Sequence, residues 1–307
     1  MRKLSGLLIG VMAATLALTG CAFSDPRIAG TPVAPATDPG LTAQAEAAGQ
    51  THTAWRAVAG LAAADPATPK WAVMADTLAA QWRVLSGPDA LHRVSAVAAD
   101  IGEPAAVEDA DEALTTADDA LRAVREANLD RAGQASGLAA VFWASLAAGA
   151  EQVRLGLRSD YGTATEADAG ATIATTDPDT AWSELACRYD EGIFALRSAL
   201  GFLDADDSAG EVIASAVAAL RHDKASLGSA STAPPGCPGI YELPPGRDRA
   251  ASLNLLATTQ QSLVEATAVW LASVDDPASA VGYLMTNATL ASPLGLGQAV
   301  WPGWPDR

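Results

Sequence analysis

Residues 182–203 read WSELACRYDEGIFALRSALGFL, and their apolar positions decide the fold class. The large apolar side chains recur at intervals of three and four residues, at Trp182, Leu185, Tyr189, Ile193, Leu196, Leu200 and Leu203. This spacing places them on one face of an α-helix. Because no segment of the chain shows a sustained strand alternation, the sequence predicts an all-α protein.

The same helical period recurs on both sides of this stretch. Before it, three stripes cover residues 41–62, 71–85 and 107–124, and a fourth helix is expected from about residue 131 to 157, opening just after Asp130. After it, two stripes cover residues 213–227 and 253–274, and a last helix is expected to begin near Pro277. The pairs Asp65-Pro66 and Gly87-Pro88 mark helix ends, since proline disfavours the helical conformation of the residue before it.

The helices fall into two sets that resemble a repeat. The first set covers residues 41–158 and the second covers residues 180–292, with a linker at about 159–179 and a Pro/Trp tail at 293–307. In each set the second helix ends in a similar motif, Leu85-Ser86-Gly87 or Leu227-Gly228-Ser229, before a long third helix. The pattern predicts two four-helix bundles in tandem, and one fused eight-helix bundle is the alternative.

The first 21 residues indicate an exported protein. Arg2 and Lys3 precede an apolar run that is shorter than the roughly 20 residues of a membrane span and ends in Leu18-Thr19-Gly20-Cys21. This ending resembles the lipobox of bacterial lipoproteins, in which residues 1–20 would be removed and the Cys21 thiol would carry a diacylglycerol. An ordinary cleaved signal peptide is the alternative. The lipobox implies a lipid-anchored protein on the outer face of the cytoplasmic membrane, with residues 21–40 as a flexible tether.

The charge excludes nucleic acid as a partner. The formal net charge is −17, and it becomes −19 when Arg2 and Lys3 leave with the signal peptide. Affinity for nucleic acid depends on cationic contacts with phosphate, which a surface this acidic does not offer. The acyl chains on Cys21, rather than electrostatics, are therefore expected to hold the protein at the membrane.

Two cysteines remain after Cys21. Cys187 lies within a helical stripe and Cys237 lies in a Pro/Gly-rich loop. Outside the cytoplasm such a pair normally oxidises, so the sequence predicts a Cys187–Cys237 disulfide. A metal site or a reactive thiol pair is the alternative, and neither suits the long spacing without a neighbouring His.

Residues 180–292 resemble a ferritin-like domain of unknown function found in secreted proteins and lipoproteins of high-GC Gram-positive bacteria. The segments that carry this resemblance are residues 182–189, 219–223, 241–244 and 264–270. The resemblance implies a ferritin-like four-helix bundle, and the first set of helices would be a diverged copy of it. The family has no established activity to carry over.

A ferritin-like bundle raises the question of a di-iron site, which needs a Glu from each of two helices and a Glu-x-x-His from each of the other two. The chain contains no Glu-x-x-His. Glu184, His222 and Glu265 are displaced from the apolar stripes of their helices and are expected to point away from the core. The sequence therefore predicts no metal site, no cofactor and no catalytic constellation, without excluding an enzyme.

Four residues remain as candidates for contact with a ligand or partner. His52 and Gln260 lie on apolar stripes, where each is expected to be a hydrogen-bonded core residue or, alternatively, a ligand contact. Trp301 and Trp304 lie in the tail, which is expected either to fold back on the bundle or to bind a membrane protein or the lipid interface. The acidic runs at 108–112 and 204–207 lack the spacing of a calcium loop and are expected to be solvated.

We expect a membrane-anchored, non-enzymatic helical module that binds a protein or small ligand at the cell surface. Its expected partners are membrane lipid, through Cys21, and a membrane or cell-surface protein. Two alternatives remain: a ferritin-like metal-binding protein or oxidoreductase, and a transporter-associated solute-binding lipoprotein. The latter are usually two α/β lobes, which an all-helical sequence does not favour.

Overall fold

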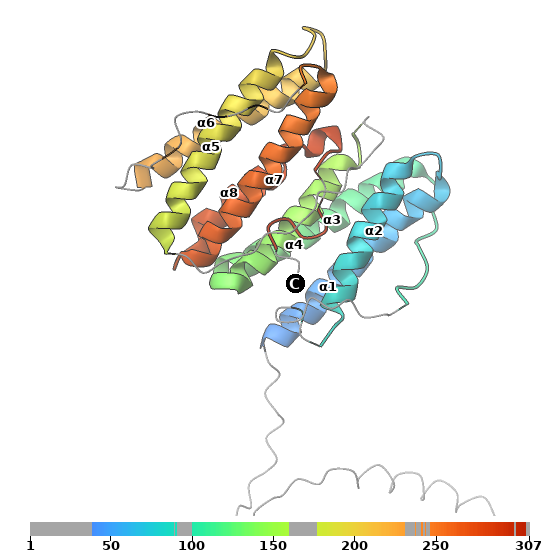
Figure 1. Ribbon diagram of the computed structural model, residues 1–307. Coiled ribbons are helices and arrows are strands. Elements are labelled where there is room, and N and C mark those ends of the chain that lie inside the picture. The colour runs from blue at the N-terminus through green and yellow to red at the C-terminus, as the bar shows by residue number, and fades with distance from the viewer. Residues whose placement is uncertain are drawn as a thin grey trace, which may run out of the picture. The chain divides into compact units, whose positions relative to one another are not determined.

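The computed structural model describes residues 39–88, 90, 100–159, 177–230, 237, 241, 243, 246–297 and 299–304. In this part of the chain all regular structure is helical and no strand occurs, which confirms the all-α prediction. The elements follow in the order α1 (Pro39–Ala64), α2 (Pro69–Leu85), α3 (Ala110–Gln134), α4 (Gly137–Gly156), α5 (Pro178–Leu200), α6 (Ala209–Ala230), α7 (Arg249–Ser273), α8 (Pro277–Ala288) and the short 3-10 helix η1 (Ser292–Leu294) (Figure 1).

Aspartates and prolines fix most helix starts. A side-chain oxygen accepts a hydrogen bond from a first-turn backbone N–H at Asp109 for α3, Asp177 for α5, Asp248 for α7 and Asp276 for α8. Such a cap stabilises a helix by about 1 kcal/mol. Proline stands in the first turn of α2, α5 and α8, where its missing N–H costs no hydrogen bond. The expected helix start near Pro277 is confirmed, as are the ends before Asp65 and Gly87.

The expected boundary between the third and fourth helices is wrong. Asp130 does not precede a helix; it lies inside α3, which continues to Gln134, and α4 begins only at Gly137. Ala135 and Ser136 adopt extended conformations, and Gly137 has a positive φ of 56° that favours glycine. An Ala-Ser-Gly sequence is a weaker signal than the Asp-Pro and Gly-Pro pairs that end the first two helices.

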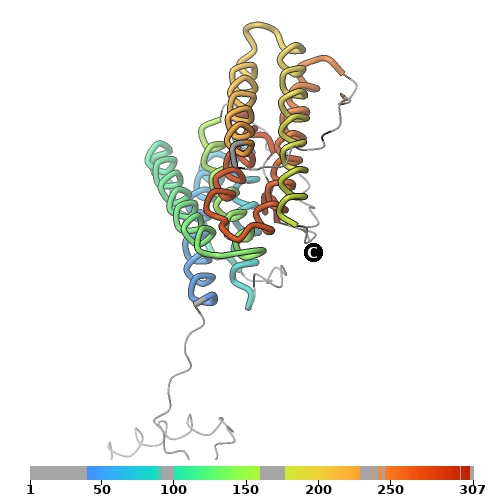
Figure 2. The backbone as a smooth tube through the Cα atoms, turned by 90° about the vertical axis from the view of Figure 1, so that its left-hand side faces the viewer, coloured from blue at the N-terminus to red at the C-terminus, as the bar shows by residue number. Residues whose placement is uncertain are grey.

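The helices pack in antiparallel pairs, and the order of packing is the same in both sets (Figures 1 and 2). In the first set α1 packs on α2 and α3, and α3 packs on α4. In the second set α5 packs on α6 and α7, and α7 packs on α8. This arrangement is that of helical bundles, and the recurrence agrees with the repeat expected from the sequence.

The two helix sets also carry buried polar side chains at corresponding positions. Asn128 and Thr267 each lie 18 residues after the first residue of α3 or α7, and each donates a hydrogen bond to the carbonyl four residues earlier. Gln81 and Asp223 each lie four residues before the leucine that begins the motif at the end of the second helix in their set, and both are buried. Each set thus places a buried polar side chain at the same point of the helix.

The two sets share an apolar core. α4 contacts α7 and α8, and α3 contacts α8. The cluster at this junction combines residues of both sets, among them Phe142 and Leu146 from α4 and Leu271 and Leu284 from α7 and α8. Each set also has an apolar cluster of its own, which makes three clusters among the described residues. Because the junction cluster joins the two sets, the described residues from Pro39 onward form one compact unit.

The end of the described chain is held by three buried glutamines. Gln81 donates to the carbonyl of Val300 at 2.6 Å, and Gln152 donates to those of Ala288 and Gly297. Gln260 donates to the carbonyl of Gly297 at 2.7 Å and accepts from the N–H of Ala291 at 2.7 Å. Because these amides satisfy backbone groups that packing has removed from water, they fix the path of residues 288–300 across both sets.

Candidate functional site

The predicted pairing of the two cysteines is confirmed. Cys187 on α5 and Cys237 form a disulfide with a Cα–Cα distance of 5.0 Å, inside the usual range for such a bond. The bridge fastens the segment between α6 and α7 to the surface of α5. Tyr241 and Leu243, the next described residues of this segment, lie beside the same helix.

Tyr241 and Leu243 cover a hollow between α5 and α7, which we call the α5–α7 groove. Its volume is about 290 Å³, close to the lower end for small-molecule pockets. Its lining residues are Arg188, Glu191, Gly192, Phe194, Ala195, Tyr241, Leu243, Asn254, Leu255, Thr258, Thr259 and Ser262.

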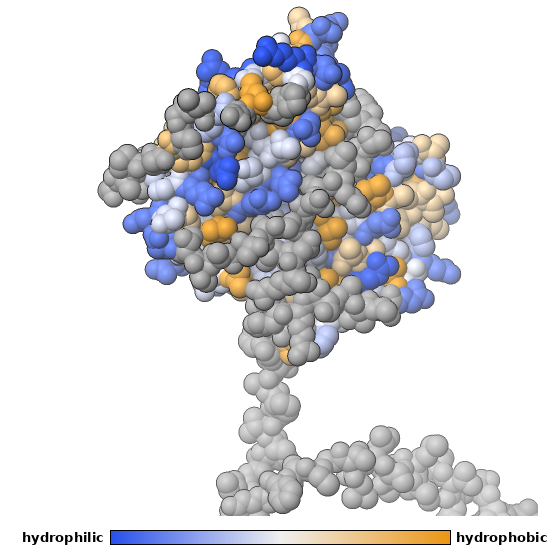
Figure 3. Space-filling view, viewed as in Figure 1, coloured by the Kyte–Doolittle hydropathy of each residue, from blue (hydrophilic) through white to orange (hydrophobic). Residues whose placement is uncertain are grey.

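Phe194 forms the aromatic edge of the groove. Among the described large apolar side chains only Leu41, Leu138 and Phe194 are exposed, and Phe194 is 41 % exposed. Its ring centroid lies 5.8 Å from that of Tyr241, with 36° between the ring planes. On the face that Figure 3 shows, apolar residues lie in small patches among polar ones. An exposed phenylalanine beside a second aromatic ring is therefore a candidate contact for a ligand or partner.

A glycine sets the depth of the groove. A Cβ at Gly192 would lie 2.8 Å from Cγ2 of Thr259 and 3.3 Å from Cδ1 of Leu220, so no larger residue fits without a shift. The missing side chain lets α5 approach α7 closely at this point.

The polar lining of the groove is balanced in charge. Arg188 pairs with Glu191 at 2.9 Å and with Glu184 at 3.7 Å, all three being exposed enough for water to screen the pairs. The amide of Asn254 and the hydroxyls of Ser262 and Tyr241 form no hydrogen bond within the described structure, which leaves them available to a ligand. Burial, with smaller contributions from Asp190 and Glu191, raises the pKa of Tyr241, so its phenol is neutral at physiological pH.

A second polar cluster lies inside the second helix set. The amide nitrogen of Asn287 on α8 donates to the hydroxyl of Tyr189 on α5 at 2.9 Å and to that of Thr267 on α7 at 2.8 Å. All three residues are fully buried. Asp223 on α6 is also buried, and within the described structure neither its Oδ2 nor the Oδ1 of Asn287 has a hydrogen-bond partner.

Burial sets the protonation of this cluster. Removal from water raises the pKa of Asp223, with a smaller opposing effect from His222. Burial is also the largest cause of the raised pKa values of Tyr189 and Tyr283, and the charge of Asp223 adds to both. Asp223 was not predicted from the sequence, where the adjacent His222 was the candidate residue. The available signal was position, since residue 223 continues the stripe between Leu220 and Leu227.

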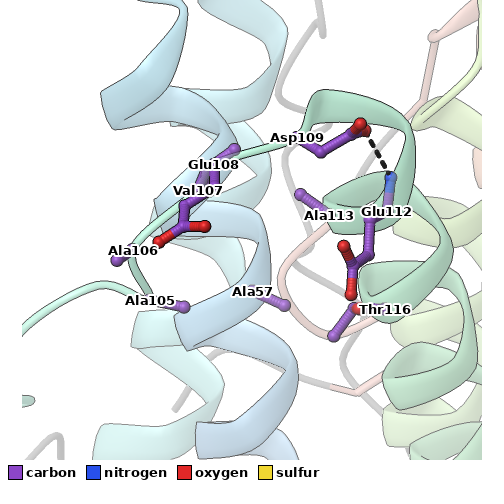
Figure 4. Close-up of a pocket in the computed structure, with 9 residues that line it drawn as sticks. All are labelled: Ala57, Ala105, Ala106, Val107, Glu108, Asp109, Glu112, Ala113 and Thr116. Carbon is purple, nitrogen blue, oxygen red and sulfur yellow. Dashed lines mark hydrogen bonds between the residues drawn. The ribbon is translucent and has the colours of Figure 1, made fainter.

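Another hollow lies between α1, α3 and the segment before α3 (Figure 4). Ala105 donates its N–H to the carbonyl of Arg56, and a Cβ at Gly60 would lie 2.5 Å from the carbonyl oxygen of Ala105, so this segment rests directly on α1. The polar lining is acidic, with Glu108, Asp109 and Glu112 all exposed. Asp109 is occupied in capping α3, and the run at 108–112 forms the solvated face expected from the sequence.

The remaining sequence candidates lie in different places. A ring nitrogen of His52 lies 2.8 Å from the carbonyl oxygen of Ile101, and its ring packs against Trp55 and Trp82. Gln260 is buried and holds the segment after α8, as described above. Cys21 lies outside the described residues.

Trp301 and Trp304 are buried rather than presented on the surface. Both rings pack on Phe142 of α4, with centroid distances of 5.5 and 5.3 Å, at the junction between the helix sets. The tail therefore folds back on the helices in this structure.

The potential metal ligands are dispersed. Within the described residues no three His, Cys, Asp or Glu side chains are grouped so that they could hold a metal ion. Glu184 and His222 are exposed, as their register predicts, and Glu265 is half-buried beside Gln261. None of the described helices has the length and apolar character of a bilayer span.

The part of the chain that the structure describes falls in a broad class, that of helical proteins, with eight α-helices packed in antiparallel pairs. Comparisons with protein-family models, with curated proteins and with solved structures found no match for this chain.

Proposed function

We propose that the protein is a non-enzymatic binding module, anchored through a lipid on Cys21 to the outer face of the cytoplasmic membrane. We further propose that its two helix sets are tandem ferritin-like bundles and that the α5–α7 groove is the binding site. The observation that carries the proposal is this groove, lined in part by Tyr241 and Leu243, which follow the disulfide-bonded Cys237 in the chain.

The disulfide supports the proposed location. Structural disulfides persist in oxidising compartments, whereas cytoplasmic thiols are kept reduced. Together with the lipobox-like Leu18-Thr19-Gly20-Cys21, a bond between Cys187 and Cys237 favours a chain that folds outside the cytoplasm. Stable anchoring takes two hydrophobic signals, which an acylated thiol and an acylated amine on one cysteine would supply.

The lining of the groove supports binding. An exposed phenylalanine, a second aromatic ring and three polar side chains that form no hydrogen bond with the described residues line one hollow. Small-molecule sites combine apolar and aromatic walls with a few converging polar groups in this way. Two other hollows among the described residues lack this combination: the one in Figure 4 is acidic, and the one between α6 and α8 has no aromatic residue.

The interior of the second set favours a binding module over a ferritin-type metal site. A di-iron site requires carboxylates and histidines from four helices directed at one point. At the level of Asp223 the neighbouring helices supply Tyr189, Thr267 and Asn287 instead, and two hydroxyls with an amide are poor substitutes for those ligands. The all-helical fold also supports this function over that of a transporter-associated solute receptor of two α/β lobes.

Cell fractionation tests the proposed anchor. A Cys21→Ala variant should be released to the medium or remain as an uncleaved precursor. Membrane retention of a mature-length Cys21→Ala protein would contradict the anchor.

Photo-cross-linking in intact cells tests the binding site. A photoreactive benzoylphenylalanine at position 194, in the groove, should give a discrete covalent adduct. The same residue at Glu211, in the hollow between α6 and α8, serves as the control and should give none. The absence of any adduct at position 194 would contradict a binding role for the groove.

A further inference from the structure

We propose that the α5–α7 groove binds one ring of a neutral saccharide, with a C–H face of the sugar packed on Phe194 and Tyr241 and its hydroxyls bonded to α7. This inference rests on the proposed function, because it names the ligand class of the same groove. Three properties of the lining carry it: two adjoining aromatic rings, unpaired neutral hydrogen-bonding groups, and a balanced charge.

The aromatic rings match the apolar side of a sugar. A pyranose ring presents C–H bonds that carry a partial positive charge, and the face of an aromatic ring carries partial negative charge. Phe194 is exposed, and its ring adjoins that of Tyr241 with a 36° tilt, so together the two form a shallow platform. Leu243 extends this apolar surface on the loop side.

The opposite wall matches the hydroxyls. Asn254, Thr258 and Ser262 recur every four residues along α7 and therefore lie on one face of it. Thr258 already donates to the carbonyl of Asn254, whereas the Asn254 amide and the Ser262 hydroxyl form no hydrogen bond with the described residues. An amide and a hydroxyl can each donate and accept, as can the hydroxyls of a sugar.

Charge selects against ionic ligands. Arg188, the cationic residue in the described lining of the groove, is already paired with Glu191 and Glu184, and the chain carries a net charge of −17. A cationic ligand would have to displace Arg188 from Glu191. A purely aromatic ligand would cover Asn254 and Ser262 without replacing their bonds to water, which costs free energy.

The disulfide preorganises the platform. Tyr241 follows Cys237 by four residues, and Cys187 lies one helical turn before the groove residue Glu191. The bond therefore limits the positions that the tyrosine can reach, which reduces the ordering cost of binding. Binding should weaken when the disulfide is reduced.

Titration of the full chain, purified from membranes in detergent, tests the inference. The probes are glucose, N-acetylglucosamine, glucose 6-phosphate and p-cresol, and binding is followed by calorimetry and by saturation-transfer NMR. We expect one or both neutral sugars to bind, and glucose 6-phosphate and p-cresol to bind at least about tenfold more weakly or not at all.

Substitutions of surface residues locate the sugar-binding site, and they are expected to leave the fold unchanged. Phe194→Ala should lower sugar affinity about tenfold, the upper end for an aromatic contact, and Asn254→Ala should also lower it. Thr286→Ala, in the hollow between α6 and α8, is the matched control and should leave affinity unchanged. Circular dichroism confirms that each variant is folded, and reductant should weaken binding to the unsubstituted protein.

The outcomes separate the two proposals. Binding of p-cresol or glucose 6-phosphate without either neutral sugar would overturn the saccharide inference and leave the groove as a binding site. Sugar binding that Phe194→Ala and Asn254→Ala leave unchanged would also overturn the inference. If no probe binds but a photo-adduct forms at position 194, the saccharide inference alone is refuted. If no probe binds and no photo-adduct forms, the groove is refuted as a binding site.

Discussion

Replacement of Trp304 by alanine should strongly destabilise the protein, because this side chain joins the two helix sets. Trp304 is 1 % exposed and lies in the apolar cluster that contains residues of α4, α7 and α8. Its ring meets that of Phe142 edge to face, with centroids 5.3 Å apart. Truncation therefore removes a large buried surface and leaves a cavity.

The expected loss can be estimated from these contacts. Replacing a buried tryptophan by alanine costs about 3–5 kcal/mol. In the described structure the indole N–H of Trp304 has no hydrogen-bond partner, so removing it relieves a penalty that offsets part of the loss. We expect a net loss of roughly 3 kcal/mol, which lowers Tm by about 6–12 °C in a chain of this size.

Differential scanning calorimetry and urea unfolding measure this loss. Phe194→Ala is the control, since that ring is exposed and its removal should change stability by no more than about 0.5 kcal/mol. If Trp304→Ala stays within the same 0.5 kcal/mol of the unsubstituted protein, the tail does not contribute to the shared core and the reasoning fails.

Two further substitutions test local packing and charge. Gly192→Ala should destabilise the folded protein by about 1–2 kcal/mol, because the new Cβ would lie 2.8 Å from Thr259. The control Gly49→Ala, whose Cβ would have nothing within 4 Å, should stabilise it by about 0.5–1 kcal/mol. Equal effects of the two substitutions in urea unfolding would argue against a close approach of α5 and α7. Burial raises the pKa of Asp223, so its carboxyl keeps its proton to a higher pH in the folded state than in the unfolded state. As pH rises from about 4 through the raised pKa, the carboxyl therefore lowers the free energy of unfolding. Asp223→Asn should therefore gain stability over the unsubstituted protein as pH increases, and a pH-independent difference in urea unfolding between pH 4 and 8 would count against the buried charge.

The local structure could be predicted from the sequence because its signals are local. Apolar spacing identified the helices, and pairs such as Asp65-Pro66 identified their ends. The break between α3 and α4 was misplaced because Ala135 is a strong helix former and Ser136 disfavours a helix only weakly, so tertiary packing rather than local preference determines where α3 ends.

The shared core and the groove could not be predicted in this way. A helical stripe shows that a face is buried and not which helix covers it, so the contacts of α4 with α7 and α8 left no mark in the sequence. The groove combines residues 188–195 with residues 241–243 and 254–262, and only the fold and the disulfide bring these segments together. The burial of Asp223 was open to prediction from its stripe, but the absence of a hydrogen-bond partner for its Oδ2 within the described structure was not.

Intact mass spectrometry of the native protein, extracted from cell membranes, tests the proposed anchored module most directly. The proposal predicts a chain that begins at Cys21, carries the mass of a diacylglycerol and acyl group, and contains two hydrogen atoms fewer than the reduced form because Cys187 and Cys237 are bonded. A chain without lipid, or a lipidated chain with both thiols free, would contradict it.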